Sequence, residues 1–508
     1  MISPGRTCET NENKPRIIQK RNATNSPKCG NQPTKIRLID DFRASAINAI
    51  VETEDANIPD TLDSLIAVSS FFALVKPGCD LYCATADFAH AYKHVPILED
   101  HRQFATILLA PPQGDLKAAC LRTQPFGSKR APTNWPRVTL FLKWLMLTVF
   151  NVVINVYVDD VFIVETAETI NNAFLVFKAV CELLGFQLEV SKQQEPTKTP
   201  NLLGAEITLT QRWITARLPG RKRKDLINEL KQALSNGTLT PAQAAKLRGR
   251  LGFSQSLLFG RMGRALLNPL SARQYSKTSG RFHPLNEQLK QTLEWWIEIL
   301  RTANPRRTML TPPKPCVVYC DASGTGHIGF YIKNGEEIRT GNTHLPEWFT
   351  KIGGIFEYEL AGAIYALFAA SVVWPGLPIL LCVDNSAAAA TLVRGNCPSD
   401  LGAILAAVFW CAAASSSTPV WVEEVRSKFN VADTPSRLCA FIPDRPSFHF
   451  SNHGVPDTFA DVFANYESLL RARTKSPAQG QGFLSPWECT AQNAESNKTN
   501  AETNAETA

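Results

Sequence analysis

The run Asn155–Val164, NVYVDDVFIV, places two adjacent aspartates between two strand-like segments. β-Branched and aromatic residues predominate in 152–158 and 161–164, and only Asp159 and Asp160 separate these runs, which predicts a tight hairpin with an Asp-Asp turn. Such turns usually carry Gly or Asn, and two neighbouring carboxylates repel each other. A divalent cation at the hairpin tip would offset that repulsion; the alternative is a solvated turn without a ligand.

The composition indicates a globular protein of about two to four domains, with 508 residues and 44% hydrophobic content. The chain has 53 Lys and Arg residues and 46 Asp and Glu residues. This small positive excess matters for nucleic-acid binding mainly if the basic side chains are clustered. The 13 scattered cysteines include no CxxC pair, which indicates reduced thiols in an intracellular protein, cytoplasmic or nuclear. The N-terminus lacks the apolar segment of a secretory signal. Polar and charged residues interrupt the longest apolar run, 138–164, so we expect no membrane span.

Residues 1–34 are polar and lack apolar periodicity, and they are predicted to form a disordered tail. Basic and apolar residues then alternate in KIRLIDDFR, as in a strand with one charged face. We expect Lys35 and Arg37 on this face to contact a triphosphate or a template; the alternative is a surface strand with ion pairs. A helix is predicted over 59–75.

The segment CATADFAHAYKHVPI contains a strand that ends at Asp87. A strand end fixes a carboxylate toward a cleft, which suits a metal ligand, although a helix cap would use the same residue. The later segment QPFGSKRAPTNWPR contains a turn and several cations, and a long helix is predicted from 132 to 150. Its first turn offers donors to phosphate, unless the segment is a generic loop before a core helix.

Five segments in this order resemble the polymerase core of a reverse transcriptase, over about residues 35–215. They are KIRLIDDFR, TADFAHAYKHVPI, QPFGSKRAPTNWPR, INVYVDDVFIV and the run from GFQL through Lys192 to LLG. The resemblance implies that Asp87, Asp159 and Asp160 are catalytic and hold two Mg²⁺ ions, with Mn²⁺ as a possible substitute. It also implies a set of nucleotide-binding residues, namely Lys35, Arg37, Tyr92, Phe126, Gly127 and Lys192. Tyr92 matches the aromatic residue that excludes a ribose 2′-hydroxyl; core packing is the alternative.

Residues 216–305 are helical and basic, as in a polymerase thumb or connection. Thr240, Pro241 and Gln243 predict a capping box, and Leu247 and Leu251 lie on an inward face of the helix that follows. The stretch LRGRLGFSQSLLFGRMGRALLNPL resembles the segment after the polymerase in DIRS-like elements and some pararetroviruses. We expect five cations to follow a nucleic-acid backbone, or else to form a solvated face: Lys246, Arg248, Arg250, Arg261 and Arg264.

After a proline-rich linker over 306–315, four acids follow in β-β-α-β-α order. Asp321 and Asp384 end predicted strands, Glu359 lies on a helix, and Asp433 lies in NVADTPSR. Each alone has an ordinary explanation as a turn or cap residue. Together they resemble a ribonuclease H domain over about 314–440, which implies that all four bind two Mg²⁺ ions and cleave RNA.

Glu357 competes with Glu359, but two residues span about 200° around a helix, so only one points inward. The ELxA pattern of the family matches Glu359. Residues 425–429, shortly before Asp433, include no His, whereas cellular ribonucleases H often have one there; we expect this to affect turnover rather than metal binding.

The resemblance implies an α+β protein: a right-hand polymerase with fingers and palm over 35–215 and a thumb over 216–305, then an α/β ribonuclease H-like domain over 316–440. Residues 441–508 are predicted to be a largely disordered extension with an amphipathic piece at 458–470. The expected activity is that of an RNA-directed DNA polymerase with ribonuclease H, from a DIRS-like or gypsy-like retrotransposon. Its partners would be an RNA template, a DNA primer, RNA–DNA hybrid and deoxynucleoside triphosphates.

Two other functions fit the sequence less well. A decayed element would only bind nucleic acid through its basic helices, but all seven acids are intact. A DNA-templated polymerase with an attached nuclease fits the metal ligands but not the ordered segments. The sequence leaves the oligomeric state open.

Overall fold

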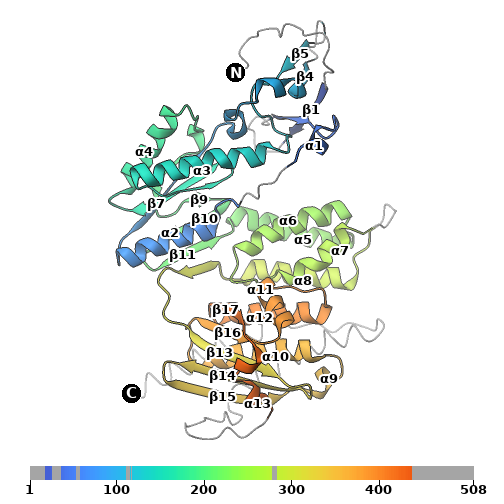
Figure 1. Ribbon diagram of the computed structural model, residues 1–508. Helices are drawn as coiled ribbons and strands as arrows, with labels where there is room; N and C mark the ends of the chain where they lie inside the picture. Colours follow the sequence, from blue (N-terminus) through green and yellow to red (C-terminus); the bar gives the residue numbers. More distant parts are fainter. Residues whose placement is uncertain are drawn as a thin grey trace. The chain divides into compact units, whose positions relative to one another are not determined.

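The computed structural model describes residues 18–25, 36–52, 58–109, 115, 117–276 and 283–437. The chain divides into two compact units, which are shown in Figure 1. The first contains residues 1–214 and 308–311, and the second contains 215–307 and 312–508. The predicted C-terminal extension, 441–508, lies outside the described residues.

An antiparallel four-stranded sheet forms the centre of the first unit, in the order β6-β7-β3-β8. Its strands are β3 (Leu81–Asp87), β6 (Ile154–Tyr157), β7 (Asp160–Thr166) and β8 (Gln194–Thr197). Successive residues of β3 and β7 are buried, so both faces of the sheet are covered. Figure 1 shows α3 (Ala131–Phe150) and α4 (Ile170–Leu183) on one side and α2 (Leu62–Val75) on the other.

The helices of this unit agree with the apolar periodicity of the sequence. Helix α2 begins at Leu62, three residues later than predicted. The preceding residue, Thr61, caps the helix, because its hydroxyl accepts a hydrogen bond from the amide of Asp63. Helix α3 covers the predicted range and buries Trp135, Leu142 and Met146 against the sheet. The unit also contains short helical elements: α1 (Ile47–Ile50) and the 3₁₀ turns η1 (Ala91–His94), η2 (Glu99–Ala105) and η3 (Val190–Lys192).

Two further sheets contain strands that the sequence did not predict. Strand β1 (Ile18–Asn25) lies in the range predicted to be a disordered tail. It pairs with β2 (Ile36–Asp41) and with β4 (Thr106–Leu109), which in turn pairs with β5 (Lys117–Cys120). Strand β1 has few apolar residues and no apolar alternation, so the sequence could not predict it; it forms by pairing with β2 and β4.

The other small sheet has the order β12-β11-β10-β9. It consists of β9 (Asn201–Leu202), β10 (Ala205–Leu209), β11 (Trp213–Arg217) and β12 (Arg306–Met309). Strand β12 therefore occupies the first part of the predicted linker. The backbone continues this pairing at Leu310, whose amide donates to the carbonyl of Arg212 at 2.9 Å.

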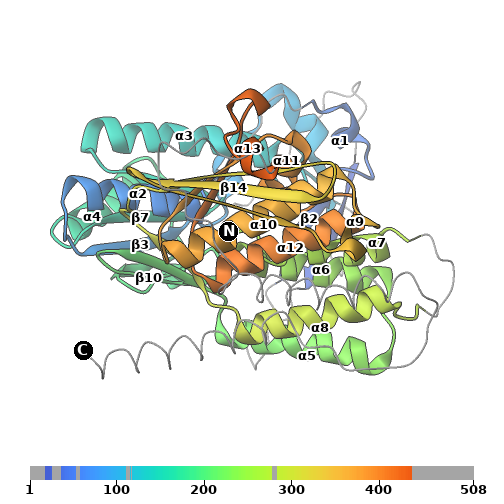
Figure 2. The same ribbon diagram turned by 90° about the horizontal axis from the view of Figure 1, so that it is seen from below.

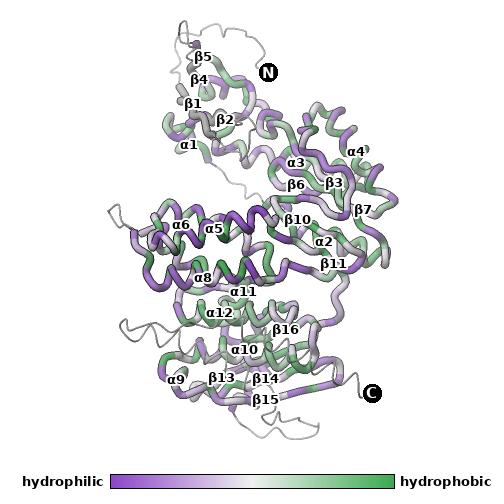
Figure 3. Tube along the Cα trace, turned by 180° about the vertical axis from the view of Figure 1, so that it is seen from behind, coloured by the Kyte–Doolittle hydropathy of each residue, from purple (hydrophilic) through white to green (hydrophobic). Residues whose placement is uncertain are grey.

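The second unit begins with four helices: α5 (Gly220–Asn236), α6 (Pro241–Ser256), α7 (Asn268–Gln274) and α8 (Glu287–Thr302). The predicted capping box of α6 is confirmed, since Thr240 and Gln243 exchange side-chain to backbone hydrogen bonds. Leu247 and Leu251 are buried, also as predicted. Figure 3 colours much of α5 as hydrophilic and most of α10 and α12 as hydrophobic.

A five-stranded mixed sheet follows, in the order β15-β14-β13-β16-β17. The strands are β13 (Cys316–Ala322), β14 (His327–Asn334), β15 (Glu337–His344), β16 (Ile379–Val383) and β17 (Val420–Glu424). The first three pair antiparallel, whereas β13, β16 and β17 run parallel. The sequence did not predict β15, because this edge strand is mostly polar and half-exposed.

The helices of this part are α9 (Glu347–Thr350), α10 (Ile355–Val373), α11 (Ser386–Arg394), α12 (Asp400–Ser415) and α13 (Asp433–Ser436). Figure 2 shows α10 and α12 side by side, and they are in contact. By length and composition α10 is apolar enough to cross a membrane, but 67% of its apolar window is buried inside the unit. Its contacts with β13, β14 and α12 explain this composition as that of a core helix.

The helical part and the mixed sheet share one hydrophobic core, which runs from Leu226 on α5 to Trp410 on α12. Asn268 and Asn396 exchange two amide hydrogen bonds of 2.7 Å between the two parts. A side chain at Gly260 would overlap the ring of Trp410. The predicted thumb or connection thus packs on the predicted nuclease domain within one compact unit.

Candidate active sites

The hairpin formed by β6 and β7 carries its aspartates differently from the prediction. Tyr157 pairs with Asp160, so the turn consists of Val158 and Asp159, and Asp160 is the first residue of β7. Val158 has a φ of 57°, in the left-handed region. Tight hairpin turns need positive φ, which costs a residue other than glycine about 1–2 kcal/mol. The predicted Asp-Asp turn is therefore wrong by one residue.

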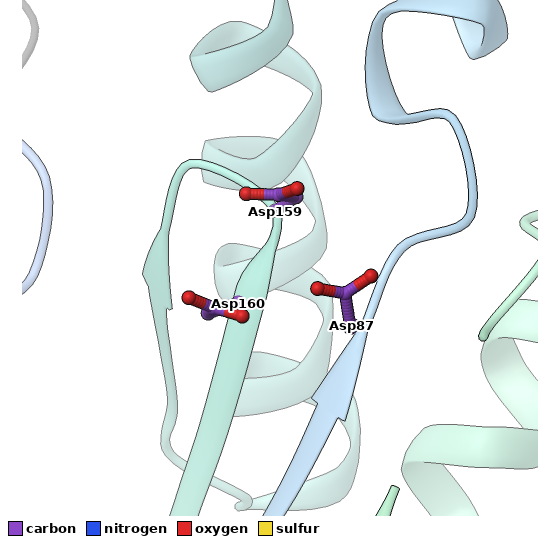
Figure 4. A group of neighbouring side chains, drawn as sticks. All are labelled: Asp87, Asp159 and Asp160. Atoms are coloured by element: carbon purple, nitrogen blue, oxygen red, sulfur yellow. The ribbon is translucent and has the colours of Figure 1, made fainter. Parts of the chain in front are cut away.

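Asp87 and the two hairpin aspartates lie together, and we call them the first acidic cluster. Asp87 ends β3 and is the direct cross-strand partner of Asp160 on β7. The amide of Phe88 donates to the carbonyl of Asp159 at 2.9 Å, which fixes the turn against the end of β3. One carboxylate oxygen from each aspartate lies within 4.8 Å of the others, and Figure 4 shows the three side chains converging.

The first acidic cluster concentrates negative charge in a partly buried place. Burial, and then repulsion from Asp159 and Asp87, raises the pKa of Asp160 to about 6. Lys192 Nζ lies 2.5 Å from Asp87 Oδ2. Burial acts to lower the pKa of Lys192, but the hydrogen bond to Asp87 and the three carboxylates raise it. One ammonium against three carboxylates leaves an excess of negative charge, and hard oxygen ligands of this kind suit a divalent cation.

Two of the predicted nucleotide-binding residues are aromatic and pack on each other. The rings of Tyr92 and Phe126 have centroids 5.3 Å apart. Burial, and then the charge of Asp159, raises the pKa of the Tyr92 hydroxyl. The Asn48 side chain holds the following loop, because it donates to the Gly127 carbonyl at 2.8 Å and accepts from a backbone amide two residues later at 2.9 Å. Sequence reasoning did not identify Asn48.

The remaining predicted nucleotide ligands are not placed. Lys35 lies outside the described residues, and Arg37 lies in β2 with only its backbone described.

Asp321, Glu359 and Asp384 form the second acidic cluster. Asp321 lies near the end of β13, and Asp384 follows β16, its parallel neighbour, so both side chains emerge at the same edge of the sheet. Glu359 on α10 faces this edge and is only 4% exposed. One carboxylate oxygen from each lies within 4.8 Å of the others. Glu357 instead accepts from the Gly354 amide at 2.9 Å, so the choice of Glu359 as the inward-facing acid is confirmed.

This second cluster places carboxylates in a more deeply buried position than the first. Burial, and then repulsion from Asp321 and Asp384, raises the pKa of Glu359 to about 9. Burial raises the pKa of Asp321 to about 6, although the hydrogen bond from Ser436 acts to lower it. Glu359 Oε2 has no hydrogen-bond partner in the described part of the chain. A buried carboxylate with an unpaired oxygen, in a group of three acids, fits a metal ligand.

Asp433, the fourth predicted acid, is not one of the three whose oxygens converge. It forms an ion pair of 2.7 Å with Arg437. The same segment instead supplies two hydrogen bonds to Asp321: Ser436 Oγ donates to Oδ2, and Asn430 Nδ2 lies 3.4 Å from Oδ1. The sequence analysis concentrated on acids and so missed both residues, although both lie within the NVADTPSR string.

The five predicted nucleic-acid-binding cations do not form one free stripe. Lys246 and Arg250 both pair with Glu229 on α5. Arg248 donates to the Ser271 hydroxyl at 2.6 Å, and Arg261 donates to the carbonyl of Val393 at 3.2 Å. The last of the five, Arg264, has its pKa lowered by burial and then by the charge of Arg261. Sequence spacing could not show that an acid from α5 lies between two of these cations.

No protein-family model matches the chain, and no curated protein matches it. Among solved structures, the chain is similar to the foamy viral protease-reverse transcriptase dRH with double-stranded DNA, at 18% identity and a TM-score of 0.43 over 80% of this chain and 65% of that one. It is also similar to the foamy viral protease-reverse transcriptase with RNA/DNA hybrid, at 16% identity and a TM-score of 0.42, over 82% and 51% of the two chains. A third complex, with double-stranded DNA, has 18% identity and a TM-score of 0.42, over 79% and 77%.

The match thus spans less than two thirds of the first of these structures. TM-scores below 0.5 describe a partial likeness, which by itself assigns no activity to this chain.

Proposed function

We propose that this chain is an RNA-directed DNA polymerase joined to a ribonuclease H, encoded by a retrotransposon of the DIRS-like or gypsy-like kind. The observation that carries the proposal is the presence of two separate acidic clusters, one in each compact unit, each with three carboxylates within 4.8 Å. Each cluster joins the end of one strand to residues from distant parts of the chain. Phosphoryl-transfer sites that use two metal ions need this convergence of carboxylates.

In the first unit, Asp87, Asp159 and Asp160 would hold the metal ions, with Mg²⁺ as the proposed ion and Mn²⁺ as a substitute. Bound ions would supply a Lewis acid and lower the pKa of the attacking primer hydroxyl. The chain's own residues hold and orient the reactants. Lys192, at 2.5 Å from Asp87, is placed to bind a phosphate oxygen once a metal takes over that carboxylate.

The aromatic pair Tyr92 and Phe126 would select the sugar of the incoming nucleotide. Tyr92 and Phe126 are in contact, so the phenol ring cannot withdraw toward Phe126 to make room for a 2′-hydroxyl. Gly127, with a φ of 102°, lets the backbone after Phe126 turn without a side chain that would cover the nucleotide. This arrangement favours deoxynucleotides.

In the second unit, Asp321, Glu359 and Asp384 would hold the metal ions that activate water against an RNA phosphodiester. Asp433 would take part from the rim of the site, where it is half-exposed and pairs with Arg437. The hybrid would be recognised by its backbone shape and 2′-hydroxyls rather than by sequence. Cations on α6 and the loop after it would contribute contacts to phosphate.

The test is an assay of the purified full chain on a DNA primer annealed to a labelled RNA template, with Mg²⁺ and deoxynucleoside triphosphates. We expect primer extension together with shortening of the RNA strand, and loss of both on chelation. Binding of the hybrid without extension or cleavage would show instead a protein that only binds nucleic acid.

A further inference from the structure

Val158, the first residue of the hairpin turn, needs support from its surroundings. Its left-handed backbone, with a φ of 57°, is unfavourable for a β-branched residue. Glycine would adopt the same conformation without a steric conflict. Because Asp159 follows directly, the direction of its carboxylate depends on how firmly the peptide at Val158 is held.

Both carbonyls of the turn accept hydrogen bonds from elsewhere in the unit. Trp135 Nε1 donates to the carbonyl of Val158. The amide of Phe88, next to Asp87, donates to the carbonyl of Asp159 at 2.9 Å. The two donors therefore attach the turn to the start of α3 and to the end of β3.

Trp135 is itself held in place. Its side chain is 0% exposed and lies in the second turn of α3. Its ring packs edge-on against Phe88, with centroids 5.0 Å apart, and against Phe186 at 6.2 Å. The indole N–H thus comes from a rigid position, and Phe88 links both anchors of the turn.

We propose that Trp135 is a positioning residue for the first acidic cluster: its indole N–H holds Val158 in the left-handed conformation that directs Asp159 toward Asp87 and Asp160. The inference rests on the proposed polymerase function of this cluster. It gives the QPFGSKRAPTNWPR segment a second role, in addition to the proposed nucleotide binding by Phe126 and Gly127.

Two substitutions separate this role from simple core packing. Trp135→Phe keeps an aromatic ring in the core but removes the donor. Val158→Gly removes the steric conflict that the hydrogen bond opposes. If the N–H acts through Val158, its loss will matter less when residue 158 is glycine, so the two effects will not be additive.

The kinetic experiment measures DNA synthesis on an RNA template for the wild type, both single variants and the double variant. We expect Trp135→Phe to lower kcat by about 10-fold, with the KM for deoxynucleotide changed by less than about 2-fold. In a chain that already carries Val158→Gly, the same change will lower kcat by less than about 3-fold. Trp144→Phe is the matched control, since Trp144 lies on the same helix with 58% of its surface exposed, and it will leave kcat unchanged.

A second experiment does not depend on catalysis. Mn²⁺ binding is measured in the full chain carrying Asp321→Asn, which disables the second cluster. We expect Trp135→Phe to weaken binding at the first cluster by about 10-fold, as for other residues that orient metal ligands. Should Trp135→Phe fold poorly, replacing Trp135 with benzothienylalanine removes only the donor and keeps the ring shape.

Wild-type kcat and Mn²⁺ affinity in Trp135→Phe would overturn the inference. An equal loss of kcat with and without Val158→Gly would also overturn it, because that result indicates packing alone. A wild-type chain that makes no DNA would contradict the proposed function instead, and the Mn²⁺ experiment would still decide the role of Trp135.

Discussion

Asp321 on β13 lies directly opposite Gly329 on β14, and the backbone of Ser436 occupies the space that a side chain at position 329 would take. A Cβ at this glycine would lie 2.5 Å from the Ser436 amide nitrogen. The absence of a side chain on β14 therefore lets α13 approach the sheet closely enough for Ser436 to hydrogen-bond Asp321.

Gly329→Ala is expected to displace α13 and to impair the second cluster. Because the obstacle is backbone, we expect a loss of about 1–3 kcal/mol in the free energy of unfolding and a fall in hybrid cleavage. Chemical denaturation and a cleavage assay measure the two effects. Gly324→Ala is the control, since it lies in the same hairpin and no neighbouring atom lies within 4 Å of the Cβ that it would gain. Equal behaviour of the two variants would contradict the proposed role of Gly329.

Glu359→Gln is expected to stabilise the metal-free protein at alkaline pH while abolishing hybrid cleavage. Burial raises the pKa of Glu359 from 4.5 to about 9, so the folded state binds its proton more tightly than the unfolded state. The raised pKa of Glu359 contributes fully to the free energy of unfolding below about pH 4.5, and this contribution is lost as the pH rises through about 9. Calorimetry should therefore show a melting temperature of the variant that increasingly exceeds that of the wild type across this range.

Mg²⁺ should reduce the difference in melting temperature between Glu359→Gln and the wild type. A bound cation neutralises the carboxylate of the wild type, whereas the amide of the variant carries no charge to neutralise. Glu357→Gln, two residues away on the same helix, is the control and should show no such alkaline gain. A wild-type protein whose stability does not fall with pH in this range would refute the buried-charge account.

Lys192→Met is expected to strengthen metal binding at the first cluster while impairing nucleotide binding. The ammonium lies 2.5 Å from Asp87 and competes with a cation for that carboxylate. We expect Mn²⁺ affinity without nucleotide to rise by about 3-fold or more and the KM for deoxynucleotide to increase. Lys198→Met, whose partner Asp80 lies outside the cluster, serves as the control in both titrations. Weaker Mn²⁺ binding in the Lys192 variant would rule out competition.

Glu229→Gln is expected to tighten nucleic-acid binding. Glu229 pairs with both Lys246 and Arg250, so a phosphate must displace it to reach either cation. We expect affinity for an RNA–DNA hybrid to rise by about 3-fold or more at low salt, and the dependence on log salt to steepen by about 1–2. Glu298→Gln removes the same charge from α8 and should change neither quantity. Unchanged binding in the Glu229 variant would mean that these cations do not contact the hybrid.

The sequence predicted the elements that have strong local signals. The helix α3 follows from its apolar length, and the start of α6 follows from Thr240 and Gln243. The resemblance to a reverse transcriptase and a ribonuclease H implied that acids from distant segments gather in two groups, and the fold brings three acids together in each of them. Local periodicity could not show β1 or β15, which depend on pairing rather than on an apolar face.

Other features depend on contacts between distant residues. The turn lies at Val158 and Asp159 because Asp160 pairs across to Tyr157, and this register is set by the ladder. Trp135 and Ser436 resemble ordinary core residues in the sequence, and only the fold reveals their hydrogen bonds to the hairpin turn and to Asp321. Asp433 was grouped with the other acids by resemblance, whereas the fold pairs it with Arg437.

The most direct test of the two-cluster account measures DNA synthesis and hybrid cleavage in parallel for Asp159→Asn and Asp384→Asn in the full chain. We predict that Asp159→Asn abolishes synthesis and retains cleavage, while Asp384→Asn abolishes cleavage and retains synthesis. Loss of both activities to the same extent in both variants would contradict the assignment of one reaction to each cluster.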